Sequence, residues 1–244
     1  MNHQPPPPDR SPYPRLLAEG DAAVTVEFGA TIDPAVNDLV LAFARAVEEQ
    51  GERDWPDLVE VVPTYRSVTL YFDPLVADWQ RLADRLLALA AGIEPARKAA
   101  PRTVEVPVLY GGEFGPDLDD VAAFAGCSPD EVVALHSSVT YRVYMLGFSP
   151  GFPYLGSVPP ALAMPRLATP RASVPAGSVG LAGSQTGIYP QESPGGWRII
   201  GRTPWRLYDP ARSEPFLIEP GDQVRFVPIT RQAYERLQAR DESR

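Results

Sequence analysis

The chain has 244 residues, 44% of them hydrophobic, which is enough for one large domain or two ordinary ones. Its formal net charge of -9 argues against a nucleic-acid partner, and its single cysteine, Cys127, excludes an intrachain disulfide and a two-cysteine zinc site. The sequence contains no membrane-length apolar run and no signal-peptide pattern at its start, so we expect a cytoplasmic protein that contacts no membrane.

The first hundred residues predict a small domain behind a Pro-rich tail. Residues 1–14 are expected to be disordered or extended. Hydrophobic periodicity then predicts a strand, a helix, two strands and a helix, at residues 23–28, 33–49, 58–62, 67–72 and 77–91. In the second helix, Trp79 is among the positions expected to face inward. This order is typical of a sheet covered by helices on one face, so residues 15–100 predict an N-terminal α+β domain.

Residues 101–230 predict a β-barrel domain. A strand at 103–109 precedes two short helices, and the second opens with Ser128 and Glu131 in a capping box. Short apolar or alternating runs cut by Gly and Pro then predict strands at 140–145, 178–181, 187–189, 197–200, 206–208 and 223–227. Many short strands of this kind are typical of a closed antiparallel barrel or a sandwich. Residues 231–244 are expected to form a charged, helical and partly frayed C-terminal tail.

Polar residues stand among the Gly- and Pro-rich turns of the second domain. Turn geometry explains most of the glycines and prolines, but not these side chains. Five arginines and one acid, Glu192, fall between Pro165 and Tyr208 in a chain that is acidic as a whole. Such a positive zone favours a carboxylate- or phosphate-bearing ligand, and a solvated arginine face is the alternative.

The candidate site residues come from this stretch. Arg166, Gln191 and Arg198 also lie in or beside the turns. The backbone N–H groups at Gly195 and Gly196 could bind an anion. Trp197, after those glycines, is either a core residue or a pocket wall. Arg202 is a candidate catalytic residue, and the candidates for binding substrate or nucleotide are Arg171, Gln185, Tyr189, Ser193, Gly195, Gly196 and Thr203.

His136 is the only histidine outside the N-terminal tail. A general base that works near neutral pH is commonly a histidine, so His136 is the second candidate catalytic residue. The alternative is that it closes its helix by interacting with the last carbonyl groups. Cys127 is expected to be a packing residue, and no cluster of acids or histidines predicts a metal site. Lys98, the only lysine, lacks the flanks of a phosphate-binding loop, so a nucleotide would depend on arginines, backbone amides or a partner.

Several long segments resemble the KipI/allophanate hydrolase subunit 1 family. One lies in the first domain, VPTYRSVTLYFDP. The others, in the second domain, are LHSSVTYRVYMLGFSPGFPYLG, TPRASVPAGSVGLAGSQTGIYPQESPGGWRIIGRTPW and PGDQVRF. The resemblance spans roughly residues 15–230 and is most specific in the second domain. It implies an N-terminal α+β domain followed by a cyclophilin-like β-barrel.

The resemblance also implies an activity. Members resemble the B subunit of an ATP-dependent 5-oxoprolinase, a hydrolase that opens the lactam of 5-oxoproline to glutamate and is active only as a complex. The partners would be a homologous C subunit, together with a separate A subunit. ATP would be a co-substrate, with Mg, and no tightly bound cofactor is implied. Phosphorylating the lactam oxygen creates a leaving group, and arginines and backbone donors would stabilise the phosphoryl charge. The alternatives are a KipI-type inhibitor of a sporulation histidine kinase and a partner protein in urea or allophanate metabolism.

Overall fold

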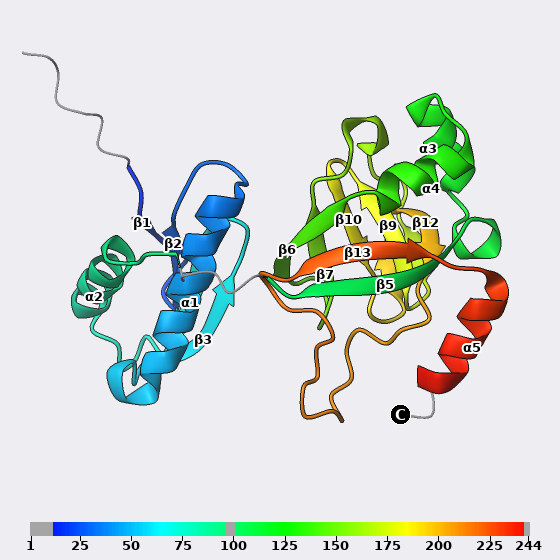
Figure 1. Ribbon diagram of the computed structural model, residues 1–244. Helices are drawn as coiled ribbons and strands as arrows, with labels where there is room; N and C mark the ends of the chain where they lie inside the picture. Colours follow the sequence, from blue (N-terminus) through cyan, green and yellow to red (C-terminus); the bar gives the residue numbers. More distant parts are fainter. Residues whose placement is uncertain (1–11, 96–100, 242–244) are drawn as a thin grey trace, which may run out of the picture. The chain divides into compact units, whose positions relative to one another are not determined.

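The computed structural model describes residues 12–95 and 101–241, and the chain divides into two compact units, 1–98 and 99–244 (Figure 1). The boundary between the two domains that the sequence predicts, after residue 100, lies two residues later than this division. Most of the predicted Pro-rich tail lies outside the described residues. Within the described ranges, no helix has both the length and the apolar character that crossing a membrane requires.

The first unit is a four-stranded antiparallel sheet with two helices. The strand order is β1-β2-β4-β3. The elements are β1 (Arg15–Ala18), β2 (Ala23–Glu27), α1 (Pro34–Asp54), β3 (Leu58–Pro63), β4 (Ser67–Phe72) and α2 (Trp79–Ala91). Phe43 of α1 and Leu86 of α2 join one core with Val26 and Leu70, which lie on the same face of the sheet. The predicted α+β unit with helices on one face is confirmed, and β1 is an additional edge strand.

Both helices begin at an acidic N-cap. Asp33 accepts hydrogen bonds from two backbone N–H groups ahead of it, and Pro34 follows at the first helical position. Asp78 caps α2 by accepting one hydrogen bond, from the backbone N–H of Arg81. The prediction that Trp79 faces the core was wrong, because its side chain is 42% exposed. Trp79 is the first residue of α2, ahead of the turns that pack on the sheet, and its ring lies beside that of Phe72 at 6.1 Å.

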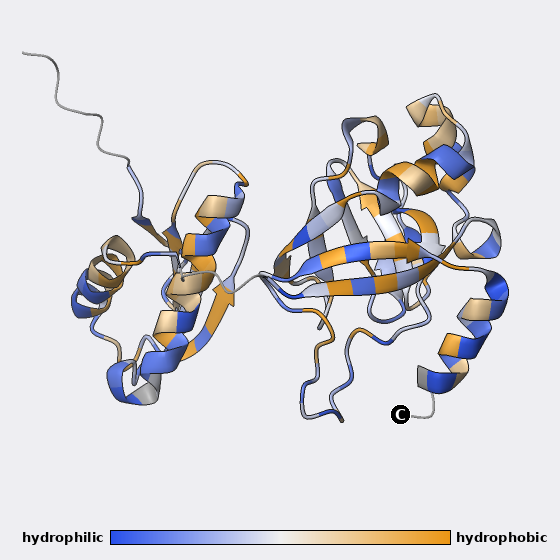
Figure 2. Ribbon diagram, viewed as in Figure 1, coloured by the Kyte–Doolittle hydropathy of each residue, from blue (hydrophilic) through white to orange (hydrophobic). Residues whose placement is uncertain are grey.

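The second unit is a closed seven-stranded barrel with strand order β10-β7-β6-β13-β5-β12-β9. The strands are β5 (Thr103–Tyr110), β6 (Thr140–Leu146), β7 (Pro153–Gly156), β9 (Ser178–Ala182), β10 (Gln185–Ile188), β12 (Arg198–Arg202) and β13 (Gln223–Pro228). One pair departs from the predicted antiparallel pattern: β5 and β13 run parallel, side by side (Figure 1). A parallel pair needs a long connection, and here the rest of the barrel supplies it. Hydrophobic and hydrophilic residues alternate along both strands (Figure 2).

Short helical elements pack against the barrel. They are the 3-10 turn η1 (Gly112–Phe114), α3 (Leu118–Ala125), α4 (Pro129–Ser137) and the 3-10 turn η2 (Pro160–Leu162). Val121 of α3 and Val132 of α4 belong to the barrel core. The predicted capping box is present, since Ser128 and Glu131 exchange hydrogen bonds at the start of α4. The helix predicted in the C-terminal tail is present as α5 (Arg231–Asp241), which contacts β5, and its Tyr234 is 6% exposed.

A separate pair of strands, β8 (Arg171–Val174) and β11 (Ser193–Gly195), lies outside the barrel. The sequence did not predict these strands or β7. The strand predicted at 206–208 was wrong, because only Tyr208 forms an isolated bridge there. A second apolar cluster, distinct from the barrel core, consists of Phe152, Val174, Ala182, Tyr189, Trp197 and Ile199.

Candidate functional site

The outer wall of the barrel has a patch where two paired residues lack side chains. Gly180 of β9 and Gly187 of β10 are register partners. A Cβ atom at Gly187 would come within 3.0 Å of the rings of Phe152 and Trp197. A Cβ atom at Gly180 would come equally close to the Cβ of Trp197. The two glycines therefore let both aromatic side chains lie directly against the barrel wall.

Five aromatic rings gather on this wall. The ring centroid of Phe152 lies 5.5 Å from Phe148, 4.9 Å from Tyr154, 5.2 Å from Tyr189 and 5.3 Å from Trp197. Most of these contacts are edge-to-face, the favourable geometry for aromatic pairs. They enclose a cavity of about 100 Å³, here called the aromatic pocket, lined by Phe148, Phe152, Tyr154, Arg166, Tyr189, Gly195, Gly196 and Trp197. That volume suits one small molecule.

Tyr189 forms the inner wall of the aromatic pocket and is 1% exposed. Its hydroxyl lies against Gly195 and accepts a hydrogen bond from the backbone N–H of Trp197. Burial raises the pKa of Tyr189, and it raises the pKa of Tyr154 as well, although Arg166 opposes both changes. Both phenols therefore stay protonated at neutral pH and can donate a hydrogen bond to a ligand.

Arg166 is the one charged side chain that lines the aromatic pocket. Its guanidinium carbon lies 5.8 Å from the ring centroid of Trp197, within cation–π range. No carboxylate of the described residues forms an ion pair with it. An unpaired guanidinium beside aromatic walls is suited to bind the carboxylate or phosphate of a ligand.

The predicted positive zone was wrong in extent, because carboxylates from outside the 165–208 stretch neutralise three of its five arginines. The pairs are Arg171–Asp117 at 2.6 Å, Arg198–Asp120 at 3.4 Å and Arg206–Asp209 at 3.1 Å. Two of these acids stand at the start of α3, and the third follows Tyr208. Within the described ranges, Arg166 and Arg202 are the two arginines of the stretch without a carboxylate partner.

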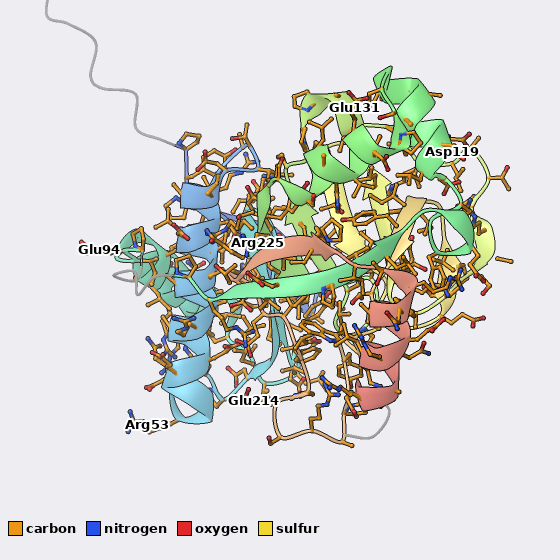
Figure 3. The ribbon with its side chains drawn as sticks, turned by 45° about the vertical axis from the view of Figure 1, so that its right-hand side comes forward. Arg53, Glu94, Asp119, Glu131, Glu214 and Arg225 are labelled. Carbon is orange, nitrogen blue, oxygen red and sulfur yellow. The ribbon has the colours of Figure 1, made fainter. Side chains whose placement is uncertain are left out.

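Arg171 supports the fold near the aromatic pocket rather than lining it. Asp117, 4% exposed, accepts hydrogen bonds from Arg171 Nη2 and from the N–H of Ile199, each at 2.6 Å. We expect Asp117→Asn to lower the free energy of unfolding by about 2 kcal/mol, since both charge-assisted hydrogen bonds weaken. Urea unfolding measures the loss. Asp119→Asn is the matched control, because Asp119 is exposed on α3 (Figure 3), and an equal loss there would contradict the prediction.

The structure separates the remaining candidates from the aromatic pocket. Thr203, 2% exposed, lines another cavity of about 410 Å³ together with Trp205. The Arg202 guanidinium lies 5.2 Å from the ring centroid of Phe114, and its Nε is buried without a hydrogen-bond partner. Ser193 Oγ is likewise buried and unpartnered, in β11, while Gln185 opens β10 beside the turn from β9. Of the predicted site residues, Tyr189, Gly195 and Gly196 come together in the pocket.

His136 lies inside the barrel, with none of its surface exposed. Nδ1 is 2.8 Å from the Tyr110 hydroxyl, and Nε2 is 2.9 Å from Thr186 Oγ1. The imidazole stacks on Phe226 at 4.5 Å between centroids. Burial lowers the pKa of His136 to about 3. The geometry gives no support to a general-base role, because the ring has no access to the aromatic pocket. The geometry does not support the helix-closing role either, because both ring nitrogens form hydrogen bonds with side chains of barrel strands and not with the last carbonyl groups of the helix.

Sequence reasoning missed three residues of the aromatic pocket: Phe148, Phe152 and Tyr154. The run GFSPGFPY carries a weak signal, since aromatic residues recur among turn formers there. The sequence left two roles open for Trp197, a core residue or a pocket wall. Trp197 has both, because it is 5% exposed and lines the pocket.

Comparisons with known proteins agree with the fold. The family profile described as carboxyltransferase domain, subdomain C and D, matches residues 14–218. The 5-oxoprolinase B subunit of Bacillus subtilis (strain 168) is 43% identical, with 88% of this chain and 92% of that protein covered. The 5-oxoprolinase B subunit of Escherichia coli O157:H7 is 46% identical, covering 88% of this chain and 95% of that one.

The solved structure of the protein TTHA0988 has a TM-score of 0.75 and 43% identity, and it covers 85% of this chain. This chain spans about 40% of the length of that protein. The resemblance seen in the sequence segments is therefore confirmed across nearly the whole chain. The chain belongs to the family of the carboxyltransferase domain, subdomains C and D, and is a relative of the B subunits of 5-oxoprolinase.

Proposed function

We propose that this chain is the B subunit of a cytoplasmic, ATP-dependent 5-oxoprolinase that works with the A and C subunits. Its identity to two curated B subunits over most of both chains supports the proposal. The observation that carries it is Arg166, an unpaired cation at a small aromatic pocket. Apolar walls with one guanidinium match a small ring that carries one carboxylate, and 5-oxoproline is such a molecule.

In this proposal the aromatic pocket holds the lactam, and ATP with Mg binds at a site shared with the partner proteins. Phosphorylation of the lactam oxygen by ATP would release ADP. Water would then add to the activated carbon, and the ring C–N bond would break to give a free amine and an acyl phosphate. A second water would displace the phosphate from this acyl group to give glutamate. Arg166 would bind the substrate carboxylate, and the protonated Tyr154 and Tyr189 would donate hydrogen bonds to its polar atoms.

We expect Arg166→Gln to raise the KM for 5-oxoproline about tenfold or more in the reconstituted three-component complex, because a charge-assisted hydrogen bond is lost. The thermal midpoint should stay close to that of wild type, since Arg166 forms no ion pair that supports the fold. The measurement is 5-oxoproline-dependent ATP turnover at varied substrate concentration.

Arg225→Gln is the control. Arg225 is exposed on β13, labelled in Figure 3, and pairs with Glu105. An equal rise in KM for both variants would remove Arg166 from the site. A wild-type complex without turnover, combined with binding of this chain to a histidine kinase, would replace the proposal with the inhibitor alternative.

A further inference from the structure

Phe148 stands at the aromatic pocket in a strained backbone conformation. Its φ is 61°, and among the described residues no other non-glycine residue has a positive φ. The N–H of Ser149 donates to the carbonyl of Gly147 at 2.6 Å, so the hydrogen bond spans Phe148 alone. A positive φ at the centre of such a three-residue turn marks the rare, strained form of the γ-turn. A side chain with a Cβ crowds the backbone there, and glycine would not.

The surrounding loop holds this conformation in place. The N–H of Gly147 donates to the carbonyl of Phe152 at 3.1 Å, and the N–H of Phe152 donates to the carbonyl of Ser149 at 3.0 Å. Burial of the Phe148 ring does not offset the strain, because the residue is 63% exposed. Its ring meets Phe152 and Tyr189 edge-on, at 5.5 Å and 6.3 Å between centroids. A strained residue that displays an exposed ring is typical of a ligand clamp.

We propose that Phe148 is a substrate-positioning residue that selects cyclic over acyclic acids. Its exposed ring forms the outer wall of the aromatic pocket and packs on the apolar face of a small cyclic carboxylic acid. Arg166 binds the carboxylate of the same molecule. This inference rests on the proposed function and deepens it, because it assigns the recognition of the ring to one residue. The strained turn directs the Phe148 side chain toward the pocket. The same backbone conformation therefore produces both the strain and the contact with the substrate.

Three substitutions separate the ring from the strain. Phe148→Gly removes both, Phe148→Ala removes the ring but keeps the Cβ, and Phe148→Tyr keeps both. In the three-component complex we expect the KM for 5-oxoproline to rise about tenfold in the Gly and Ala variants and to stay near wild type in the Tyr variant. The thermal midpoint should rise by about 2–4 °C in the Gly variant alone. Phe124→Ala, which removes an exposed ring from α3, is the control for both measurements.

A binding measurement on the full chain keeps the outcomes distinct. Trp197 lines the aromatic pocket, so 5-oxoproline should change the tryptophan fluorescence of wild type but not of Phe148→Ala. N-acetylglycine, which has the amide and the carboxylate without the ring, should bind wild type and Phe148→Ala equally weakly. Turnover and binding of 5-oxoproline that are the same in wild type and in the Phe148 variants would overturn this inference alone. Binding that depends on Phe148 without turnover would overturn the proposed function alone, and the absence of both would overturn both.

Discussion

Lowering the pH from 6.5 to 3.5 should reduce the free energy of unfolding of the barrel unit by about 3–4 kcal/mol through His136 alone. Burial lowers the pKa of His136 to about 3 in the folded chain. In the unfolded chain that pKa returns to about 6.5. Between these values the unfolded state binds a proton that the folded state excludes, so stability falls as the pH falls. Above about pH 7.5 the imidazole is neutral in both states, and this contribution is constant.

The hydrogen bonds around the ring explain why the folded state excludes the proton. Thr186 Oγ1 donates to the carbonyl of Gly180 at 3.1 Å, which leaves its oxygen to accept from Nε2 of His136. The Tyr110 hydroxyl then donates to Nδ1. This assignment of hydrogens follows from the network. A protonated imidazole would have to donate at Nδ1 too, and the Tyr110 proton would lose its acceptor inside the barrel.

The measurement is urea unfolding of wild type and of His136→Phe at pH 7 and pH 4. The variant loses two hydrogen bonds and should be less stable at pH 7. From pH 7 to pH 4, however, it should lose about 3 kcal/mol less than wild type. Carboxylates titrate in both proteins, so their contributions cancel in the difference. Equal losses would show that His136 is not held neutral, and so would an NMR resonance assigned to the His136 imidazole that titrates near pH 6.5.

Elements defined by local hydrogen bonds could be predicted from the sequence. The Asp33 cap and the capping box of Ser128 and Glu131 use side chains within three residues of their partners, so a short motif carries the whole interaction. The strands β8 and β11 were missed because they are three or four residues long and exist by pairing with each other. Pro194 in β11 also argues against a strand when it is read alone.

The candidate site could be predicted only in part, because its charges are balanced by residues distant in sequence. Arg171 and Asp117 are separated by 54 positions and Arg198 and Asp120 by 78, so counting charges along one stretch overstated the positive zone. Arg166 looks like the other arginines in the sequence, and only the structure shows that it lines the aromatic pocket without a carboxylate partner among the described residues. The positive φ of Phe148 was equally hidden, because its neighbour Gly147 is the residue to which a sequence pattern assigns such a turn.

The neighbouring glycines Gly195 and Gly196 should respond very differently to one added methyl group. A Cβ atom at Gly195 would lie 2.7 Å from Cζ of Tyr189 and closer still to its hydroxyl. Tyr189 cannot retreat easily, because it is 1% exposed and its hydroxyl accepts from the N–H of Trp197. A Cβ atom at Gly196 would meet only Pro170, at 3.6 to 3.8 Å, which is an ordinary van der Waals contact.

We therefore expect Gly195→Ala to lower the free energy of unfolding by about 2–3 kcal/mol through overpacking, and Gly196→Ala to stay within about 0.5 kcal/mol of wild type. Displacing Tyr189 also reshapes the aromatic pocket, so kcat/KM for 5-oxoproline should fall at least about 100-fold in Gly195→Ala. Urea unfolding and turnover of the three-component complex test the two parts separately. Tyr189→Phe in the Gly195→Ala background removes the clashing hydroxyl and should restore part of the lost stability. If stability does not recover at all, the Tyr189 hydroxyl is not the group that the added methyl displaces, and the overpacking assigned to that hydroxyl is wrong.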